Sequence, residues 1–273
     1  MTLPASDLPV ILVTGGTSGL GLELVKLFLK KGWFVIATGR KPLRIDGYED
    51  RFILYRVDFS DLAATAATIK TICSNHKVNL IVNNAGILSP PDFTVTGDGN
   101  EYTFQVNFLA HLLINEIIIQ RNGRSRPLRI TAITSMVHKL SKSYMNYCRG
   151  SEDYSPVKTY SDSKYFLAIM CRHLAEKYTD IGLECFSLDP GVFGSSIYRM
   201  QKGWFRLLYR IAAPFMRKPS IAAGIVTQIL GKPDIPNGAV YDIRHRVKTL
   251  QEIDAAAYNA FWEECYSLIA RFL

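Results

Sequence analysis

Residues 14–21 read Thr14-Gly15-Gly16-Thr17-Ser18-Gly19-Leu20-Gly21 and decide the fold. An apolar run over 10–14, typical of a buried strand, precedes them, and an amphipathic stretch over 20–31, closed by Gly32, predicts a helix after them. Strand, tight turn and helix N-terminus together form an anion site, because backbone N–H groups and the helix dipole point toward one place. Gly15 permits the turn, Gly19 permits the close approach of a ligand, and Gly21 permits the helix to pack against the sheet.

The rest of the chain alternates between short apolar runs and amphipathic stretches. Strands are predicted over 34–38, 53–57, 80–82, 128–134 and 182–188, and helices over 61–73, 101–120 and 159–178. Strands that are apolar throughout and separated by helices indicate a parallel sheet covered on both faces. The sequence therefore predicts an α/β fold: a Rossmann-type, doubly wound parallel sheet with three α/β/α layers, as a single domain over 1–273.

The composition narrows the function classes. The chain of 273 residues has 32 Lys and Arg against 24 Asp and Glu, without the basic stripe or motif of a nucleic-acid-binding protein. Its five cysteines are widely spaced and form no Cys/His cluster, so we expect free thiols and no metal site. Residues 1–9 lack a signal-peptide pattern and no run of 18 apolar residues occurs, so we expect a cytoplasmic protein.

The end of the second predicted strand bears on the choice between the two nicotinamide dinucleotides. An acidic residue there would hold the adenosine ribose, whereas an arginine accommodates a 2′-phosphate. This strand ends in Arg40-Lys41 with no acid, which favours NADP, although a solvated basic turn is the alternative. Asp58, after the third strand, is a candidate partner for the adenine amine or a plain helix cap.

A Tyr and a Lys four residues apart on a helix share a face, so that the ammonium can lower the pKa of the phenol. This spacing occurs three times, as Tyr154/Lys158, Tyr160/Lys164 and Tyr198/Lys202. The first pair contains Pro156, which disfavours a helix around it, and the third runs into Gly203. The Tyr160/Lys164 pair is favoured because it begins a long apolar helix and follows the strand that ends near Ser135.

At this point the residues resemble the short-chain dehydrogenase/reductase family. Residues 14–21 look like its TGxxxGxG loop, Asn83-Asn84-Ala85-Gly86 like its NNAG element, and Pro190-Gly191 like its PG turn. Its Asn-Ser-Tyr-Lys tetrad is matched by Asn107, Ser135, Tyr160 and Lys164. Finer features, such as Gln105-Val-Asn-Phe-Leu-Ala-His111 and Ser135-Met-Val-His138, are similar to the retinol-dehydrogenase-like branch.

The resemblance implies hydride transfer between nicotinamide C4 and a carbonyl or alcohol. Tyr160 would exchange a proton with the substrate oxygen and Ser135 would hydrogen-bond that oxygen. Lys164 would bind the nicotinamide ribose and lower the pKa of Tyr160, and Asn107 would hold a water linking Lys164 to solvent. Besides Arg40, Lys41 and Asp58, the residues expected to contact the cofactor are Gly15, Thr17, Ser18, Gly19, Leu20, Gly21, Asn84, Ala85, Gly86, Tyr160, Lys164, Pro190, Gly191 and Val192.

The segment 191–220 departs from the alternating rhythm, and we expect it to form a substrate lid. Within it, 198–218 combines apolar residues at helical spacing with positive charges, which indicates either a lid alone or a lid that also contacts a membrane or lipid droplet. Both interpretations imply an apolar substrate: a retinoid, steroid, lipid aldehyde or xenobiotic ketone. The helices over 101–120 and 159–178 are apolar on several faces, which fits simple burial or pairing in a homodimer or homotetramer.

The favoured function is an NADP-dependent carbonyl reductase or alcohol dehydrogenase. An epimerase or dehydratase on the same fold is the second hypothesis, although such relatives carry larger substrate domains. The third is a catalytically silent dinucleotide-binding sensor or scaffold, against which the complete set of Asn107, Ser135, Tyr160 and Lys164 argues.

Overall fold

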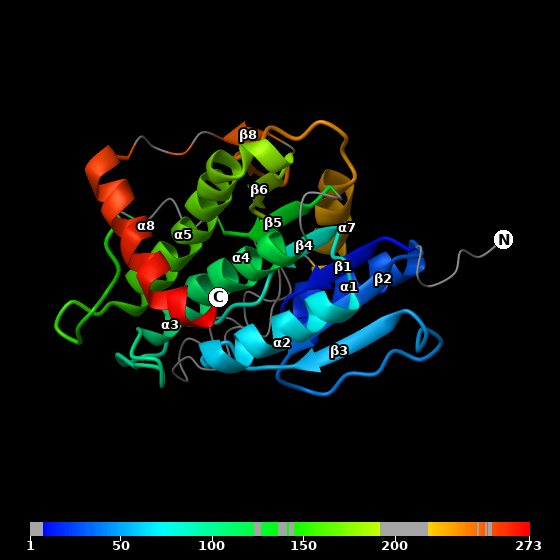
Figure 1. Ribbon diagram of the computed structural model, residues 1–273, viewed down its shortest axis with the longest axis horizontal. Coiled ribbons are helices and arrows are strands. Elements are labelled where there is room, and N and C mark those ends of the chain that lie inside the picture. Colours follow the sequence, from blue (N-terminus) through cyan, green and yellow to red (C-terminus); the bar gives the residue numbers. More distant parts are fainter. Residues whose placement is uncertain are drawn as a thin grey trace.

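The computed structural model describes residues 8–122, 127–135, 141, 145–191, 218–244, 246–248, 250 and 253–273. In these residues eight strands form one sheet in the order β3-β2-β1-β4-β5-β6-β7-β8 (Figure 1). All neighbouring strands are parallel except β7 and β8. The order reverses between β1 and β4, which opens a crevice at the carboxyl ends of these strands. The predicted Rossmann-type single domain is confirmed, with an antiparallel strand at one edge.

The strands are β1 Val10–Val13, β2 Phe34–Gly39, β3 Phe52–Arg56, β4 Leu80–Asn83, β5 Arg129–Ile133, β6 Glu184–Leu188, β7 Val240–Tyr241 and β8 Val247–Lys248. The first six begin and end within two residues of the predicted ranges, because each is an apolar run between breakers. The last two were not predicted, since two residues are too few for a periodic pattern.

The α-helices are α1 Gly19–Lys30, α2 Leu62–Asn75, α3 Tyr102–Phe104, α4 Ala110–Asn122, α5 Pro156–Lys177, α7 Pro219–Leu230 and α8 Ala255–Ile269, and short 3-10 helices follow α5 at Thr179–Ile181 and α8 at Ala270–Phe272. The predicted helix over 101–120 is not uniform, because a π-helical segment, Gln105–Leu109, joins α3 to α4. The predicted helix over 159–178 starts earlier, because Pro156 occupies its first turn, where proline is well tolerated. Pro156 thus begins α5 rather than preventing a helix, and Tyr154 lies outside it.

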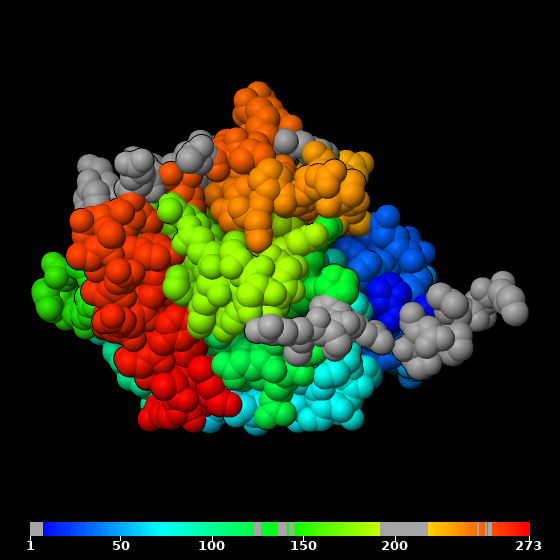
Figure 2. All heavy atoms as spheres, turned by 45° about the horizontal axis from the view of Figure 1, so that its top comes forward, coloured from blue at the N-terminus to red at the C-terminus, as the bar shows by residue number. Residues whose placement is uncertain are grey.

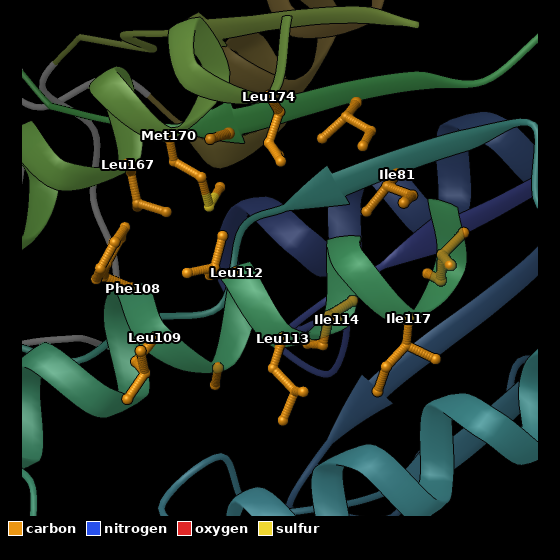
Figure 3. Packing of buried hydrophobic residues seen from close by; sticks show 14 of the residues in the cluster. Ile81, Phe108, Leu109, Leu112, Leu113, Ile114, Ile117, Leu167, Met170 and Leu174 are labelled. Carbon is orange, nitrogen blue, oxygen red and sulfur yellow. The ribbon is translucent and has the colours of Figure 1, made fainter. Parts of the chain in front are cut away.

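Helices cover both faces of the sheet. The buried residues of α1 and α7 pack in one apolar cluster with β1 and β2, and those of α2, α4 and α5 pack in a second cluster on the other face. Figure 3 shows Leu167 and Met170 of α5 pointing toward α4, whose Leu113 points to the opposite side. The α3–α4 stretch, 102–122, has the length and composition of a membrane span, but 94% of its apolar window is buried inside the fold. It is therefore a core helix here.

Helix α8 covers the outer side of α4 and α5, and Figure 2 shows α8 in red beside α5 in yellow-green. Trp262 of α8 stacks on the His173 ring of α5 at 3.9 Å between ring centres. The buried Glu116 carboxylate of α4 accepts hydrogen bonds from the Tyr266 hydroxyl of α8 at 2.6 Å and from Lys177 Nζ at 3.0 Å. The expected homodimer or homotetramer, which would pair α4 and α5 between subunits, stays a prediction.

The glycine-rich turn packs tightly on the segment that follows β4. Gly15 has a φ of +65°, and a Cβ there would lie 2.8 Å from Ala85 Cα. A Cβ on Gly21 would lie 2.3 Å from the Gly15 carbonyl oxygen and 2.5 Å from Asn84 Nδ2. The close approach at Gly21 is thus made to the turn and to Asn84, and not to a strand of the sheet as the spacing predicted.

We expect Gly21→Ala to lower the free energy of unfolding by about 1–3 kcal/mol, because the added methyl group meets backbone that cannot move away. The matched control is Gly224→Ala in α7, where a Cβ meets no atom within 4 Å. That variant should be stabilised by about 0.5–1 kcal/mol, the usual gain for Ala over Gly inside a helix. Urea unfolding measures both, and equal effects of the two substitutions would contradict the packing described for the turn.

Candidate functional site

The Lys164 side chain of α5 reaches the carboxyl edge of the sheet. Its Nζ donates a hydrogen bond to the Ile133 carbonyl at the end of β5, at 3.1 Å, and lies 5.9 Å from the Tyr160 ring centre. The residue is only 4% exposed. Burial lowers the pKa of Lys164 to about 8, because the charged ammonium has left water.

Asn107 lies in the π-helical segment and ties the chain after β4 to α5. Its Oδ1 accepts a hydrogen bond from the Ile87 N–H at 2.8 Å, and its Nδ2 donates to the Ile87 carbonyl at 2.9 Å and to Ser163 Oγ at 3.0 Å. Ser163 Oγ in turn donates to the Tyr160 carbonyl at 2.7 Å. These bonds use both amide hydrogens of Asn107, so the expected water could be held only through an oxygen lone pair.

Gly86 leaves room beside the side chains of Asn107 and Lys164. A Cβ there would lie 3.3 Å from both Asn107 Oδ1 and Lys164 Nζ. The neighbouring Asn84 donates through Nδ2 to the Thr14 carbonyl at 2.8 Å. The structure thus brings the predicted residues Asn84, Gly86, Asn107, Lys164 and Tyr160 to one region at the carboxyl ends of β1, β4 and β5 (Figure 1).

The N-terminus of α1 has the properties of a phosphate site. Ser18, its N-cap residue, makes no side-chain capping bond, and the first turn holds no acidic residue. Gly19, with a φ of +55°, has no atom within 4 Å of where a Cβ would lie, so its backbone faces open space. Thr17 packs its methyl group against Gly39, and Leu20 is buried. Free N–H groups and an open approach fit a pyrophosphate.

Arg40 and Asp58 face each other at the ends of β2 and β3. Arg40 Nη1 lies 3.5 Å from Asp58 Oδ2, and both side chains are about half exposed, so the ion pair is weak. The other Asp58 oxygen accepts hydrogen bonds from the Ser60 N–H at 3.1 Å and from Ser60 Oγ at 3.0 Å. Asp58 therefore shapes the loop before α2, while the N-cap of α2 is Asp61. Lys41 is exposed in the turn after β2.

The remaining predicted residues follow β5 and β6. Ser135 lies two residues after β5 and is half-buried, as is Tyr160. After Pro190, the Gly191 N–H donates to Asp189 Oδ1 at 2.9 Å, which shapes the turn. The described residues do not include His138 or residues 192–217 of the expected lid, which contain the predicted cofactor contact Val192. The same holds for most of the 198–218 segment on which the membrane expectation depends.

Four residues of this region were missed or unassigned at the level of sequence: Thr14, His111, Ser163 and Asp189. Each bonds a backbone group or an assigned residue. Thr14 and His111 lay within quoted motifs but had no assigned role, and Ser163 and Asp189 lay beside such motifs. Among the described residues, no group of three or more His, Cys, Asp or Glu side chains could hold a metal ion. All five cysteines are buried and unpaired.

Lys164→Met should stabilise the dinucleotide-free protein at pH 7, by at most about 3 kcal/mol, because it removes a buried ammonium. The folded-state pKa of Lys164, about 8, lies below its ordinary value of 10.5. The unfolded chain therefore binds more protons between these values, and wild-type stability from this group rises with pH. Urea unfolding from pH 7 to 10.5 should show the difference between variant and wild type narrowing; a constant difference would contradict the assigned burial.

Solved structures of low sequence identity share this fold. The NADPH-bound carbonyl reductase from chicken fatty liver superimposes with a TM-score of 0.66 and 19% identity, over 89% of this chain and 99% of that chain. A short-chain dehydrogenase from Sphingobium yanoikuyae in complex with NADPH superimposes with a TM-score of 0.68 and 18% identity, over 96% of each chain.

Sequence relatives extend the comparison. Retinol dehydrogenase 12 of Mus musculus is 27% identical over 224 residues, which cover 78% of this chain and 70% of that protein. Human polyprenol dehydrogenase is 26% identical over 207 residues, which cover 70% of this chain and 62% of that protein. The family model described as short chain dehydrogenase matches residues 9–204. The resemblance seen in the motifs is thereby confirmed, and the chain belongs to the short-chain dehydrogenase/reductase family, in its retinol-dehydrogenase-like branch.

Proposed function

We propose that this oxidoreductase uses NADP(H) to transfer hydride between nicotinamide and the carbonyl or alcohol of an apolar substrate. The observation that carries the proposal is the buried Lys164 ammonium. It lies beside Gly86 and Asn107 and next to the Tyr160 ring, at the carboxyl edge where the strand order reverses. A buried cation at the crevice of a doubly wound sheet is well suited to a ribose and to proton transfer.

The proposed mechanism assigns one task to each side chain. The nicotinamide supplies or accepts the hydride. The Tyr160 hydroxyl gives its proton to the substrate oxygen during reduction and takes it back during oxidation. The nearby ammonium of Lys164 stabilises the negative charge on the phenolate oxygen, and Ser135 donates a hydrogen bond to the substrate oxygen. Asn107 fixes the chain after β4 against α5 and keeps Lys164 and Tyr160 in register.

NADP(H) is proposed over NAD(H) because Arg40 and Lys41 follow β2 where an acidic residue would favour NAD. The guanidinium of Arg40 can fork onto a 2′-phosphate, and its weak, half-exposed pairing with Asp58 is easily exchanged for that contact. Asp58 would then meet the adenine side of the same pocket.

The proposed substrate is an apolar alcohol or carbonyl compound such as a retinoid, steroid, lipid aldehyde or xenobiotic ketone. The relatives named for retinol and polyprenol, both isoprenoid alcohols, support the lipid class within this range. A cytoplasmic protein whose 198–218 segment contacts a membrane or lipid droplet would meet such substrates where they dissolve. Both the location and the lid are proposals that rest on the sequence.

Tyr160→Phe should lower kcat by about 10²–10⁴-fold, the usual contribution of a positioned acid or base, and should leave NADPH binding nearly unchanged. The assay follows NADPH absorbance with retinal, a steroid ketone, a quinone and a lipid aldehyde. Tyr154→Phe is the matched control, because Tyr154 lies before α5 and its hydroxyl donates to the Pro90 carbonyl at 2.6 Å. If Tyr160→Phe keeps the full rate, the proposed mechanism is wrong.

Arg40→Ala should weaken NADPH binding by about 10–100-fold, the worth of a charge-assisted contact to a phosphate, and change NADH binding little. Calorimetric titration with NADPH and with NADH measures the dissociation constant of each dinucleotide for the variant and the wild type. Arg44→Ala is the control, since Arg44 is exposed and pairs with Asp46 at 3.1 Å. Equal losses for NADPH and NADH would refute the NADP preference.

A further inference from the structure

His111 is buried in the first turn of α4 and contacts three segments of the chain that no motif connects. Its Nδ1 lies 2.9 Å from the carbonyl oxygen of Asn107 in the π-helical segment. Its Nε2 lies 3.0 Å from Thr14 Oγ1 at the end of β1. The ring also meets the Phe59 ring edge-on at 5.4 Å, next to Asp58.

These contacts determine the protonation of the imidazole. A carbonyl oxygen only accepts, so the hydrogen of His111 is on Nδ1 and Nε2 is the acceptor. The hydroxyl of Thr14 therefore donates to Nε2, although the Val82 carbonyl, at 3.3 Å, is a longer alternative. Burial lowers the pKa of His111 to about 4, and the Lys164 charge acts in the same direction, so the ring is neutral near pH 7.

Thr14 Oγ1 completes the network on the other side. It accepts hydrogen bonds from the Asn84 N–H at 2.8 Å and the Ala85 N–H at 2.9 Å. A hydroxyl has one hydrogen to donate and two lone pairs to accept with, so all three are used. The network runs from Asn84 and Ala85 through Thr14 and His111 to Asn107, and its members are buried or partly buried.

Each end of the network holds a different half of the proposed cofactor site. Thr14 precedes Gly15, where the turn leading to the N-terminus of α1 begins. Asn107 bonds the chain after β4 and lies beside Lys164 through the space at Gly86. Resting on the proposed function, we propose that His111 is a positioning residue that sets the pyrophosphate turn through Thr14 and the nicotinamide end through Asn107.

Three variants separate the two links. His111→Phe keeps an aromatic ring against Phe59 and removes both hydrogen bonds. His111→Asn carries an amide N–H where Nδ1 was, and so keeps only the link to Asn107. His111→Gln carries an amide oxygen near the place of Nε2, and so keeps only the link to Thr14.

We expect His111→Phe to raise the NADPH dissociation constant and to lower kcat, each by about tenfold, the equivalent of one buried hydrogen bond. His111→Gln should restore the dissociation constant and leave kcat low. His111→Asn should restore kcat and leave the dissociation constant raised. Urea unfolding of all three is measured alongside, because a purely structural residue would move binding and rate together, in proportion to stability.

A spectroscopic readout does not depend on turnover. In ¹⁵N-histidine-labelled wild type, the His111 signal, assigned by its loss in His111→Phe, should show a protonated Nδ1 and an unprotonated Nε2 from pH 6 to 8. A protonated Nε2 in this range overturns the network.

Binding and turnover in the wild type separate the two proposals. If the wild type binds dinucleotide and reduces carbonyls while Asn and Gln variants lose binding and rate in parallel with stability, the positioning role is wrong and the proposed function stands. If the wild type binds neither NADPH nor NADH, the proposed function fails, and the positioning role of His111 fails with it.

Discussion

The close approach of two chain segments at the carboxyl ends of β1 and β4 is the constraint on which the site depends. These strands are neighbours, but the helices that follow them lie on opposite faces of the sheet, which opens the crevice. The two segments stay close because Gly15 approaches Ala85 without a side chain and the Thr14 hydroxyl accepts hydrogen bonds from the backbone N–H groups of Asn84 and Ala85. The N-terminus of α1 and the Lys164 ammonium can face one ligand because this junction holds.

Burying the Lys164 ammonium is unfavourable, and a hydrogen bond and the packing of α5 offset part of that cost. The side chain keeps one backbone acceptor at Ile133, and α5 is anchored on its far side by a dense apolar cluster with α4 and α8. Beside that cluster, the buried carboxylate of Glu116 accepts hydrogen bonds from Lys177 and from the hydroxyls of Tyr178 and Tyr266. Helix α8 therefore supports α5, which carries Lys164, and α4, which follows Asn107.

The first six strands and the glycine turn could be predicted because their signals are local. An apolar run between breakers marks a buried strand, and closely spaced glycines between a strand and a helix mark a turn. The Tyr–Lys spacing was ambiguous by itself. The structure separates two of its three occurrences, because Tyr154 lies before α5 and bonds Pro90, whereas Tyr160 shares a face with Lys164. The π-helical segment was missed, because its residues are as apolar as the helix around it.

Local pattern was enough for the order of strands and helices, the glycine-rich turn and the candidate Tyr160/Lys164 pair, because side-chain periodicity and backbone freedom act over a few residues. The contact between Thr14 and His111 could not be predicted at that level, since nothing in the local sequence distinguishes this histidine from any other buried ring in an apolar helix. They lie 97 positions apart and bond only after β1 and α4 have packed together. Partners so distant in the chain are chosen by the packing of whole elements, which only the folded molecule decides.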